Sequence, residues 1–199
     1  VGMNLKKIND QVVVIVGATS GIGLATAVRL ARNGARLVLS GRSQEALDQI
    51  LEQVRREGGE VITFPAEVTD FSQMKALADK AAETYGRIDS WVHTAAVSIY
   101  ARFEDTEPEE FKQVIDVNLT GMAFGAIAAL PYLKKEGRGS LILLSSVEGR
   151  RAVPNHSAYA ASKRGINGFA DALRMEMKEE NEPINVAVIM PASINTPFY

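Results

Sequence analysis

Short apolar runs alternate with longer amphipathic stretches along the chain. The runs consist mainly of β-branched residues and leucine and are almost continuously apolar, which is typical of strands covered on both faces. They predict strands at Val12–Val16, Arg36–Ser40, Val61–Phe64, Ser90–His93, Ser140–Leu144 and Asn185–Met190.

Between these runs, apolar residues recur at intervals of three and four, the spacing of a helix with one buried face. Gly34 and Gly58 follow two of these stretches, where a residue that accepts positive φ closes the last helical turn. Strands that alternate with helices predict a single α/β domain on a doubly wound parallel sheet with right-handed crossovers. The predicted helices are Ile22–Asn33, Gln44–Glu57, Ser72–Tyr85, Pro108–Leu133 and Ala158–Glu180.

The composition fits one domain with a sizeable core. Of the 199 residues, 46% are hydrophobic and 23% charged, and the formal net charge is −2. Because both signs of charge are interleaved, neither nucleic acid nor an anionic membrane is expected as a partner. No apolar run reaches the roughly 18–20 residues needed to span a membrane.

The chain has no cysteine, which excludes disulfides, thiolate metal sites and cysteine nucleophiles. The two histidines, His93 and His156, lie too far apart in sequence to suggest a metal cluster, so no metal is expected. The first ten residues lack the apolar core of a signal peptide. We therefore expect a cytoplasmic location.

A glycine-rich segment joins the first predicted strand to the first predicted helix. At such a junction, backbone N–H groups and the positive end of the helix bind a pyrophosphate. Glycines let the backbone approach the ligand where a Cβ would collide, although they can also serve only the turn. The segment predicts a dinucleotide site, with Gly17, Thr19, Ser20, Gly21, Ile22 and Gly23 as cofactor-binding residues.

The second predicted strand ends in Ser40-Gly41-Arg42, where a doubly wound fold meets the adenosine ribose. An acidic residue here would bind the ribose hydroxyls and repel a 2′-phosphate, and none is present. The Arg42 guanidinium fits a phosphate and the Ser40 hydroxyl adds a donor, so the pattern favours NADP(H) over NAD(H). A solvated arginine is the alternative. After the third strand, Glu67 and Val68 are placed at the adenine edge, unless Glu67 faces solvent.

Candidate catalytic residues follow the fifth predicted strand. Ser146 lies at its carboxyl end, where such sheets bind ligands. Tyr159 and Lys163 are four residues apart, so they share one face of the last predicted helix. An ammonium beside a phenol lowers the phenol pKa towards the working pH, which a proton donor requires.

These motifs, in this order, resemble the short-chain dehydrogenase/reductase family in its main branch, with Gly-x-x-x-Gly-x-Gly and Tyr-x-x-x-Lys, from about Asn9 to the end of the chain. The resemblance implies a Rossmann fold and hydride transfer between a nicotinamide and a carbonyl or alcohol carbon. It implies that Tyr159 is the general acid in reduction and the general base in oxidation. Ser146 would then bind the substrate oxygen, and Lys163 the nicotinamide ribose.

The resemblance adds further expected site residues. Asn118 matches the family asparagine that supports a proton-relay water beside the lysine, although on its own it could be a local bend in a helix. Ala95 lies in the segment under the cofactor. Pro191, Ile194 and Thr196 lie in the segment that reads the nicotinamide carboxamide.

Several features depart from the family pattern. The fourth predicted strand continues as His93-Thr94-Ala95-Ala96, where the family usually has Asn-Asn-Ala-Gly, and Ala192 stands where glycine is usual. We interpret His93 as a buried, hydrogen-bonded imidazole. Residues 1–8 are interpreted as an N-terminal extension or a cloning remnant, and residues 9–199 as the NADP(H)-binding domain. Because the family usually adds a lid, a helix and a last strand, this domain is expected to continue in the complete protein.

The sequence leaves the substrate open. Arg150, Arg151 and His156, in the stretch between Ser146 and Tyr159, either attract an anionic substrate group or are solvated loop residues. The leading hypothesis is an NADP(H)-dependent oxidoreductase acting on a small or medium-sized carbonyl or alcohol compound. A non-catalytic NADP(H)-binding regulator or sensor is the alternative. A sugar-nucleotide epimerase would need a differently spaced glycine turn and a second lobe.

Small residues on the two long predicted helices favour close packing across a two-fold axis. The family resemblance implies that these helices form a homodimer or homotetramer. The alternative is that the small residues pack only onto the sheet. These residues are Gly121, Gly125, Ala128 and Ala129 on one helix, and Gly165, Gly168 and Ala172 on the other.

Overall fold

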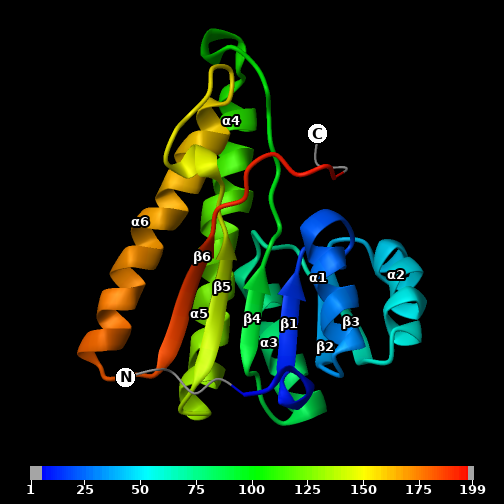
Figure 1. Ribbon diagram of the computed structural model, residues 1–199. Helices are drawn as coiled ribbons and strands as arrows, with labels where there is room; N and C mark the ends of the chain where they lie inside the picture. Colours follow the sequence, from blue (N-terminus) through cyan, green and yellow to red (C-terminus); the bar gives the residue numbers. More distant parts are fainter. Residues whose placement is uncertain (1–5, 197–199) are drawn as a thin grey trace.

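The computed structural model describes residues 6–196 and contains a six-stranded sheet in the order β3-β2-β1-β4-β5-β6 (Figure 1). All neighbouring strands run parallel, which confirms the predicted doubly wound sheet. The order reverses between β1 and β4, the place where such sheets bind ligands at their carboxyl edge. The strands are β1 (Val12–Val16), β2 (Arg36–Gly41), β3 (Glu60–Pro65), β4 (Ser90–His93), β5 (Gly139–Leu144) and β6 (Ile184–Ile189).

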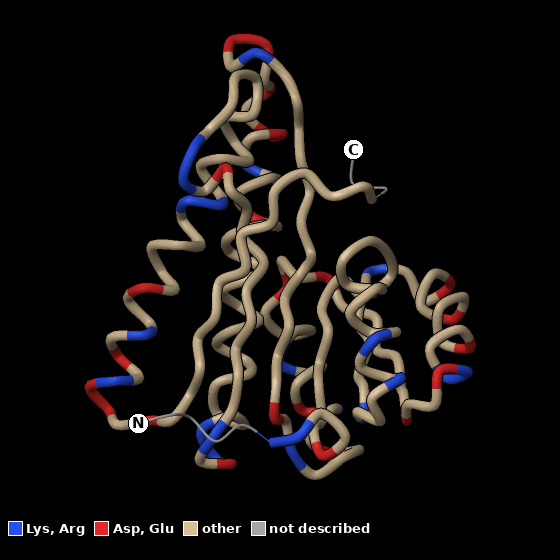
Figure 2. Tube along the Cα trace, in the orientation of Figure 1, with Lys and Arg blue, Asp and Glu red and all other residues tan. Residues whose placement is uncertain are grey.

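Helices cover both faces of the sheet. The helices α1 (Gly21–Arg32) and α2 (Gln44–Arg56) contribute to one hydrophobic cluster, together with alternate residues of β1 and β2. The helices α3 (Phe71–Tyr85), α5 (Gly121–Lys135) and α6 (Ser157–Glu179) contribute to the other. Lysines and arginines are interspersed with aspartates and glutamates along the chain trace (Figure 2).

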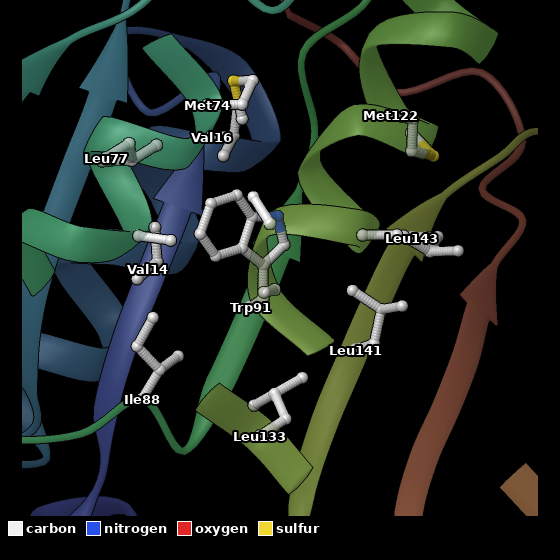
Figure 3. Packing of buried hydrophobic residues seen from close by; sticks show 14 of the residues in the cluster. Val14, Val16, Met74, Leu77, Ile88, Trp91, Met122, Leu133, Leu141 and Leu143 are labelled. Carbon is white, nitrogen blue, oxygen red and sulfur yellow. The ribbon is translucent and has the colours of Figure 1, made fainter. Parts of the chain in front are cut away.

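The two clusters explain why the β1 run is apolar throughout. Val13 and Ile15 belong to the cluster with α1 and α2, whereas Val14 and Val16 belong to the cluster with α3 and α5. Trp91 of β4 is completely buried and lies among Val14, Leu133 and other residues of the second cluster (Figure 3). A strand buried on both faces has no polar side to alternate with.

The prediction of one helix over Pro108–Leu133 was wrong in its interior. The structure has α4 (Pro108–Ile115), a π-helical turn (Asp116–Thr120) and then α5. A π turn holds one residue more than an α turn, and apolar spacing does not reveal such an insertion. By length and composition alone the helical stretch Pro108–Lys135 could cross a membrane, but α5 here packs on β4, β5 and α3.

Ion pairs hold the segment before β1 at the amino-terminal ends of the strands, opposite the carboxyl edge. Lys6 forms ion pairs with Asp89 and Glu136, and Asp89 also accepts a hydrogen bond from the Val12 N–H, 2.8 Å away. Burial would raise the pKa of the Asp89 carboxyl, but hydrogen bonds from Lys6, Val12 and Arg87 outweigh it and lower that pKa. The earlier part of the predicted N-terminal extension lies outside the described residues.

Candidate active site

A cleft of about 800 Å³ lies at the carboxyl edge of the sheet, a volume within the range of small-molecule and cofactor sites. Residues that follow each of the strands line it, and α6 contributes two more. The cleft brings together most of the predicted cofactor-binding residues, namely Gly17, Thr19, Ser20, Gly21, Ile22, Gly23, Arg42, Glu67, Val68, Ala95, Tyr159, Lys163, Pro191, Ile194 and Thr196.

Two glycines, one in the turn after β1 and one in the first turn of α1, have no room for a side chain. Gly17 has a φ of +83°, and a Cβ there would lie 2.6 Å from the Ala95 nitrogen. A Cβ on Gly23 would lie 2.0 Å from the Gly17 carbonyl oxygen. Thr94, which sequence reasoning did not select, holds the turn against β4, with its hydroxyl 2.8 Å from the Val16 carbonyl oxygen. Its position directly after β4 was the available signal.

The start of α1 offers donors to an anion. Ser20 occupies the N-cap position with extended backbone, and its side chain caps no N–H group in the described chain. The first N–H groups of a helix have no intrahelical partner, so those of α1 remain available beside the cleft. Such a helix end fits a pyrophosphate, as the glycine pattern predicts.

The two residues predicted to bind a 2′-phosphate have different environments in the structure. Arg42 is exposed and lines the cleft. Ser40 is fully buried, is not among the lining residues, and its hydroxyl has no hydrogen-bond partner within residues 6–196. Its carbonyl instead accepts hydrogen bonds from the N–H groups of Gly17 and Ala18. A side chain with this burial does not reach a phosphate, so we correct the expectation for Ser40.

Ser146, Tyr159 and Lys163 line the same cleft. Lys163 is 1% exposed, and its ammonium donates to the Leu144 carbonyl oxygen at 2.8 Å. The ammonium nitrogen lies 5.3 Å from the centre of the Tyr159 ring. Burial lowers the pKa of Lys163 to about 7. Ser146 accepts a hydrogen bond from the Glu148 N–H at 3.1 Å and thereby caps a short 3₁₀ helix, Val147–Gly149.

Asn118 lies behind the cleft rather than in its lining. It is fully buried in the π-helical turn, a kind of turn found frequently at functional sites. Its amide accepts from the Val97 N–H at 2.8 Å and donates to the Val97 carbonyl oxygen at 2.9 Å and to the Ser162 hydroxyl at 3.1 Å. Asn118 therefore joins the segment after β4 to α6. Its role in a proton relay stays a prediction.

The structure supports neither interpretation of His156. This residue is 2% exposed, and its ring stacks on Tyr159 with centroids 4.5 Å apart. It is neither a solvated loop residue nor a free cation for a substrate, because Glu148 and Ser98 bind its two ring nitrogens. Ser98 is 58 residues away in sequence, so local pattern could not reveal the contact.

His93 is buried as predicted, but the prediction that it is hydrogen-bonded was wrong. Neither ring nitrogen has a hydrogen-bond partner in the described part of the chain. Burial, with a smaller contribution from the charge of Lys163, lowers the pKa of His93 to about 3. The imidazole is therefore neutral at ordinary pH.

The match to known proteins covers nearly the whole chain. The family of short chain dehydrogenases matches residues 11–199. The chain belongs to the short-chain dehydrogenase/reductase family. Membership of this family supports oxidoreductase chemistry with a nicotinamide cofactor.

Individual members of the family show how far the similarity extends. The chain is 37% identical over 197 residues to an uncharacterised oxidoreductase of Bacillus subtilis, covering 98% of this chain and 55% of that protein's length. A short-chain dehydrogenase/reductase of Burkholderia phymatum in complex with NAD has a TM-score of 0.94, with 27% identity, 98% of this chain and 69% of that chain. A variant of actinorhodin polyketide ketoreductase with NADPH has a TM-score of 0.90, with 29% identity, 97% of this chain and 74% of that chain.

Proposed function

We propose that this chain is an NADP(H)-dependent oxidoreductase acting on a carbonyl or alcohol carbon of a small or medium-sized compound. The observation that carries the proposal is the buried ammonium of Lys163 next to the Tyr159 ring, in the same cleft as Ser146. A buried cation costs free energy unless partners compensate its desolvation. A nearby phenol that must ionise during the reaction is such a partner.

The cleft fits a dinucleotide at both of its ends. The glycine turn and the uncapped start of α1 would hold the pyrophosphate, and Lys163 would hold the nicotinamide ribose. An ammonium has three N–H donors, so Lys163 can serve the Leu144 carbonyl and a ribose hydroxyl together. When bound, the nicotinamide supplies or accepts the hydride.

The chain's own residues handle the proton and the substrate oxygen. In reduction, Tyr159 gives a proton to the oxygen that becomes the alcohol; in oxidation it takes that proton back. The positive charge of Lys163 stabilises the phenolate that remains. Ser146, which follows β5, would hydrogen-bond the same oxygen and orient it.

Preference for NADP(H) over NAD(H) rests on Arg42. Its side chain is exposed at the cleft after β2, where an NAD-specific site would carry an acid. Calorimetric titration with NADPH and, in parallel, NADH tests the proposal. Tight NADPH binding with much weaker NADH binding supports it, and a folded sample that binds neither nucleotide contradicts it. Binding without turnover of any carbonyl compound would favour a sensor.

We also propose self-association, but through fewer of the small residues than the sequence suggests. Gly121, Ala128 and their neighbours on α5 are buried within this chain. On α6, Gly165 meets the Leu119 side chain, whereas Gly168 and Ala172 are exposed. The exposed surface of α6 is therefore the better candidate for a two-fold contact. Light scattering that finds only the monomer mass would refute it.

A further inference from the structure

The ring of His156 forms one wall of the space that holds Tyr159. The two rings are stacked, with centroids 4.5 Å apart and planes 14° from parallel. His156 lies at the N-cap of α6, three residues before Tyr159, and is 2% exposed. The edge of Tyr100 contacts the imidazole at a centroid distance of 5.5 Å. Rotation of the Tyr159 ring is thus restricted by a neighbour that is itself buried.

Both nitrogens of His156 are held by residues from other parts of the chain. Nδ1 lies 2.8 Å from a Glu148 carboxylate oxygen, and Nε2 is hydrogen-bonded to the Ser98 hydroxyl. Glu148 follows β5, whereas Ser98 follows β4, and both line the cleft. The imidazole is therefore hydrogen-bonded to the segments that follow β4 and β5, and it stacks on the ring of Tyr159, the candidate proton donor.

The chemistry of these partners determines the tautomer. An ionised carboxylate only accepts hydrogen bonds, so Nδ1 must carry the hydrogen. Nε2 of the neutral imidazole then accepts from the Ser98 hydroxyl. Each ring nitrogen has one suitable partner, and this fixes the plane of the imidazole.

We propose that His156 is a positioning residue for Tyr159, and that Glu148 and Ser98 hold it in the Nδ1–H tautomer. The inference rests on the proposed role of Tyr159 in proton transfer. Displacement of a catalytic group by about 1 Å can lower the reaction rate about 10²-fold. A neighbouring ring that fixes the position of the Tyr159 phenol is therefore expected to raise kcat. His156 itself does not line the cleft, so it acts through Tyr159.

Kinetics of two His156 variants test the positioning role. We expect His156→Ala to lower kcat about 10- to 100-fold, while the KM and the nucleotide Kd stay within about threefold. His156→Phe keeps a stacking ring and should recover a large part of the lost kcat. A kcat of His156→Ala within twofold of the parent, with the fold retained by circular dichroism, would overturn the proposal. Equal losses in the two variants would also overturn it.

Nitrogen-15 NMR of the imidazoles tests the hydrogen-bond arrangement without any turnover. The chain has only two histidines, so the His156 signals are those that vanish in His156→Phe. We expect the neutral ring to be the Nδ1–H tautomer, with a shift towards the Nε2–H tautomer in Glu148→Ala. An Nε2–H tautomer in the parent protein refutes the proposal. A parent that shows the expected tautomer but reduces no carbonyl compound refutes the proposed function instead.

Discussion

The ammonium of Lys163 and the ring of Tyr159 lie 5.3 Å apart, one turn from each other on α6, and both are buried. The chain keeps a cation here although burial lowers the pKa of Lys163 to about 7. A buried lysine with this pKa lowers the free energy of unfolding at neutral pH, while its side chain lines the cleft. Stability and function therefore conflict at this position, and the conflict can be measured.

Replacing Lys163 with methionine should stabilise the protein at pH 7 while impairing nucleotide binding. The folded-state pKa of about 7 lies below the ordinary value of 10.5, so between these values the unfolded chain binds more protons. The parent should therefore gain stability as pH rises from 7, by at most about 1.4 kcal/mol per pH unit relative to Lys163→Met. Urea unfolding of both proteins at pH 7 and pH 9 measures this difference. Parallel pH dependences would contradict it.

Tyr159→Phe should separate chemistry from binding. The variant keeps the ring that stacks on His156 but cannot donate a proton. General acid–base groups contribute about 10²–10⁴-fold to rate, so kcat should fall by that factor while the NADPH Kd changes less than about twofold. Steady-state kinetics and calorimetry give the two values. Unchanged turnover would remove Tyr159 from the mechanism.

Arg42→Ala should weaken NADPH binding by about 10- to 100-fold and leave NADH binding unaltered, because only NADPH carries the 2′-phosphate that a guanidinium binds. Ser40→Ala is the matched control, since the Ser40 hydroxyl is buried away from the cleft lining. It should leave both affinities unchanged. An equal loss for both nucleotides in Arg42→Ala would argue against a phosphate contact.

Replacing His93 with leucine should make the protein more resistant to acid. Burial lowers the pKa of His93 from 6.5 to about 3, so below pH 6.5 the unfolded chain takes up a proton that the folded chain does not. The parent should lose stability relative to His93→Leu as pH falls from 6.5, by at most about 1.4 kcal/mol per pH unit. Guanidinium unfolding at pH 7 and pH 5 tests this. A constant difference between the two proteins would mean that the pKa of His93 is the same in the folded and unfolded states.

Two glycines on the long helices should respond to alanine in opposite directions. A Cβ on Gly125 would lie 2.6 Å from the His93 Nδ1, so Gly125→Ala should destabilise the fold by about 1–3 kcal/mol. Gly168 is exposed with nothing within 4 Å of an added Cβ in the single chain, so in the monomer Gly168→Ala should stabilise α6 by about 0.5–1 kcal/mol. Thermal unfolding gives both signs. Destabilisation by Gly168→Ala at concentrations where the protein self-associates would support the proposed two-fold contact through that surface.

Much of the scaffold was predictable because the local pattern of apolar and polar residues indicates which residues are buried. The β1 strand Val12–Val16 and the β4 strand Ser90–His93 begin and end as predicted. The apolar run of β1 is bounded by the polar Gln11 and by Gly17. Other strand and helix ends differ by at most two residues, apart from the interruption at the π-helical turn. The glycine turn was predictable for a similar reason, because it adjoins the first strand directly.

The errors arise where a residue's environment depends on distant parts of the chain. His156 looked like a polar loop residue, but Ser98 and Glu148 enclose it. Ser40 is a small polar residue at a strand end, and its burial depends on how the neighbouring strands and helices pack. His93 was expected to find hydrogen-bond partners, but neither ring nitrogen has one in the described chain, and Gly125 packs against the ring.

Because of the π-helical turn at Asp116–Thr120, deletion of a single residue can change the candidate active site while the packing of the flanking helices is kept. Such a turn accommodates one residue more than an ordinary α-helical turn between the same flanking segments. Deleting one residue there would let α4 keep its packing on α6, and α5 its packing on the sheet, while the widened turn closes. The Asn118 amide would then lose its bonds to Val97. We therefore expect the shortened chain to fold normally but to have lower catalytic activity.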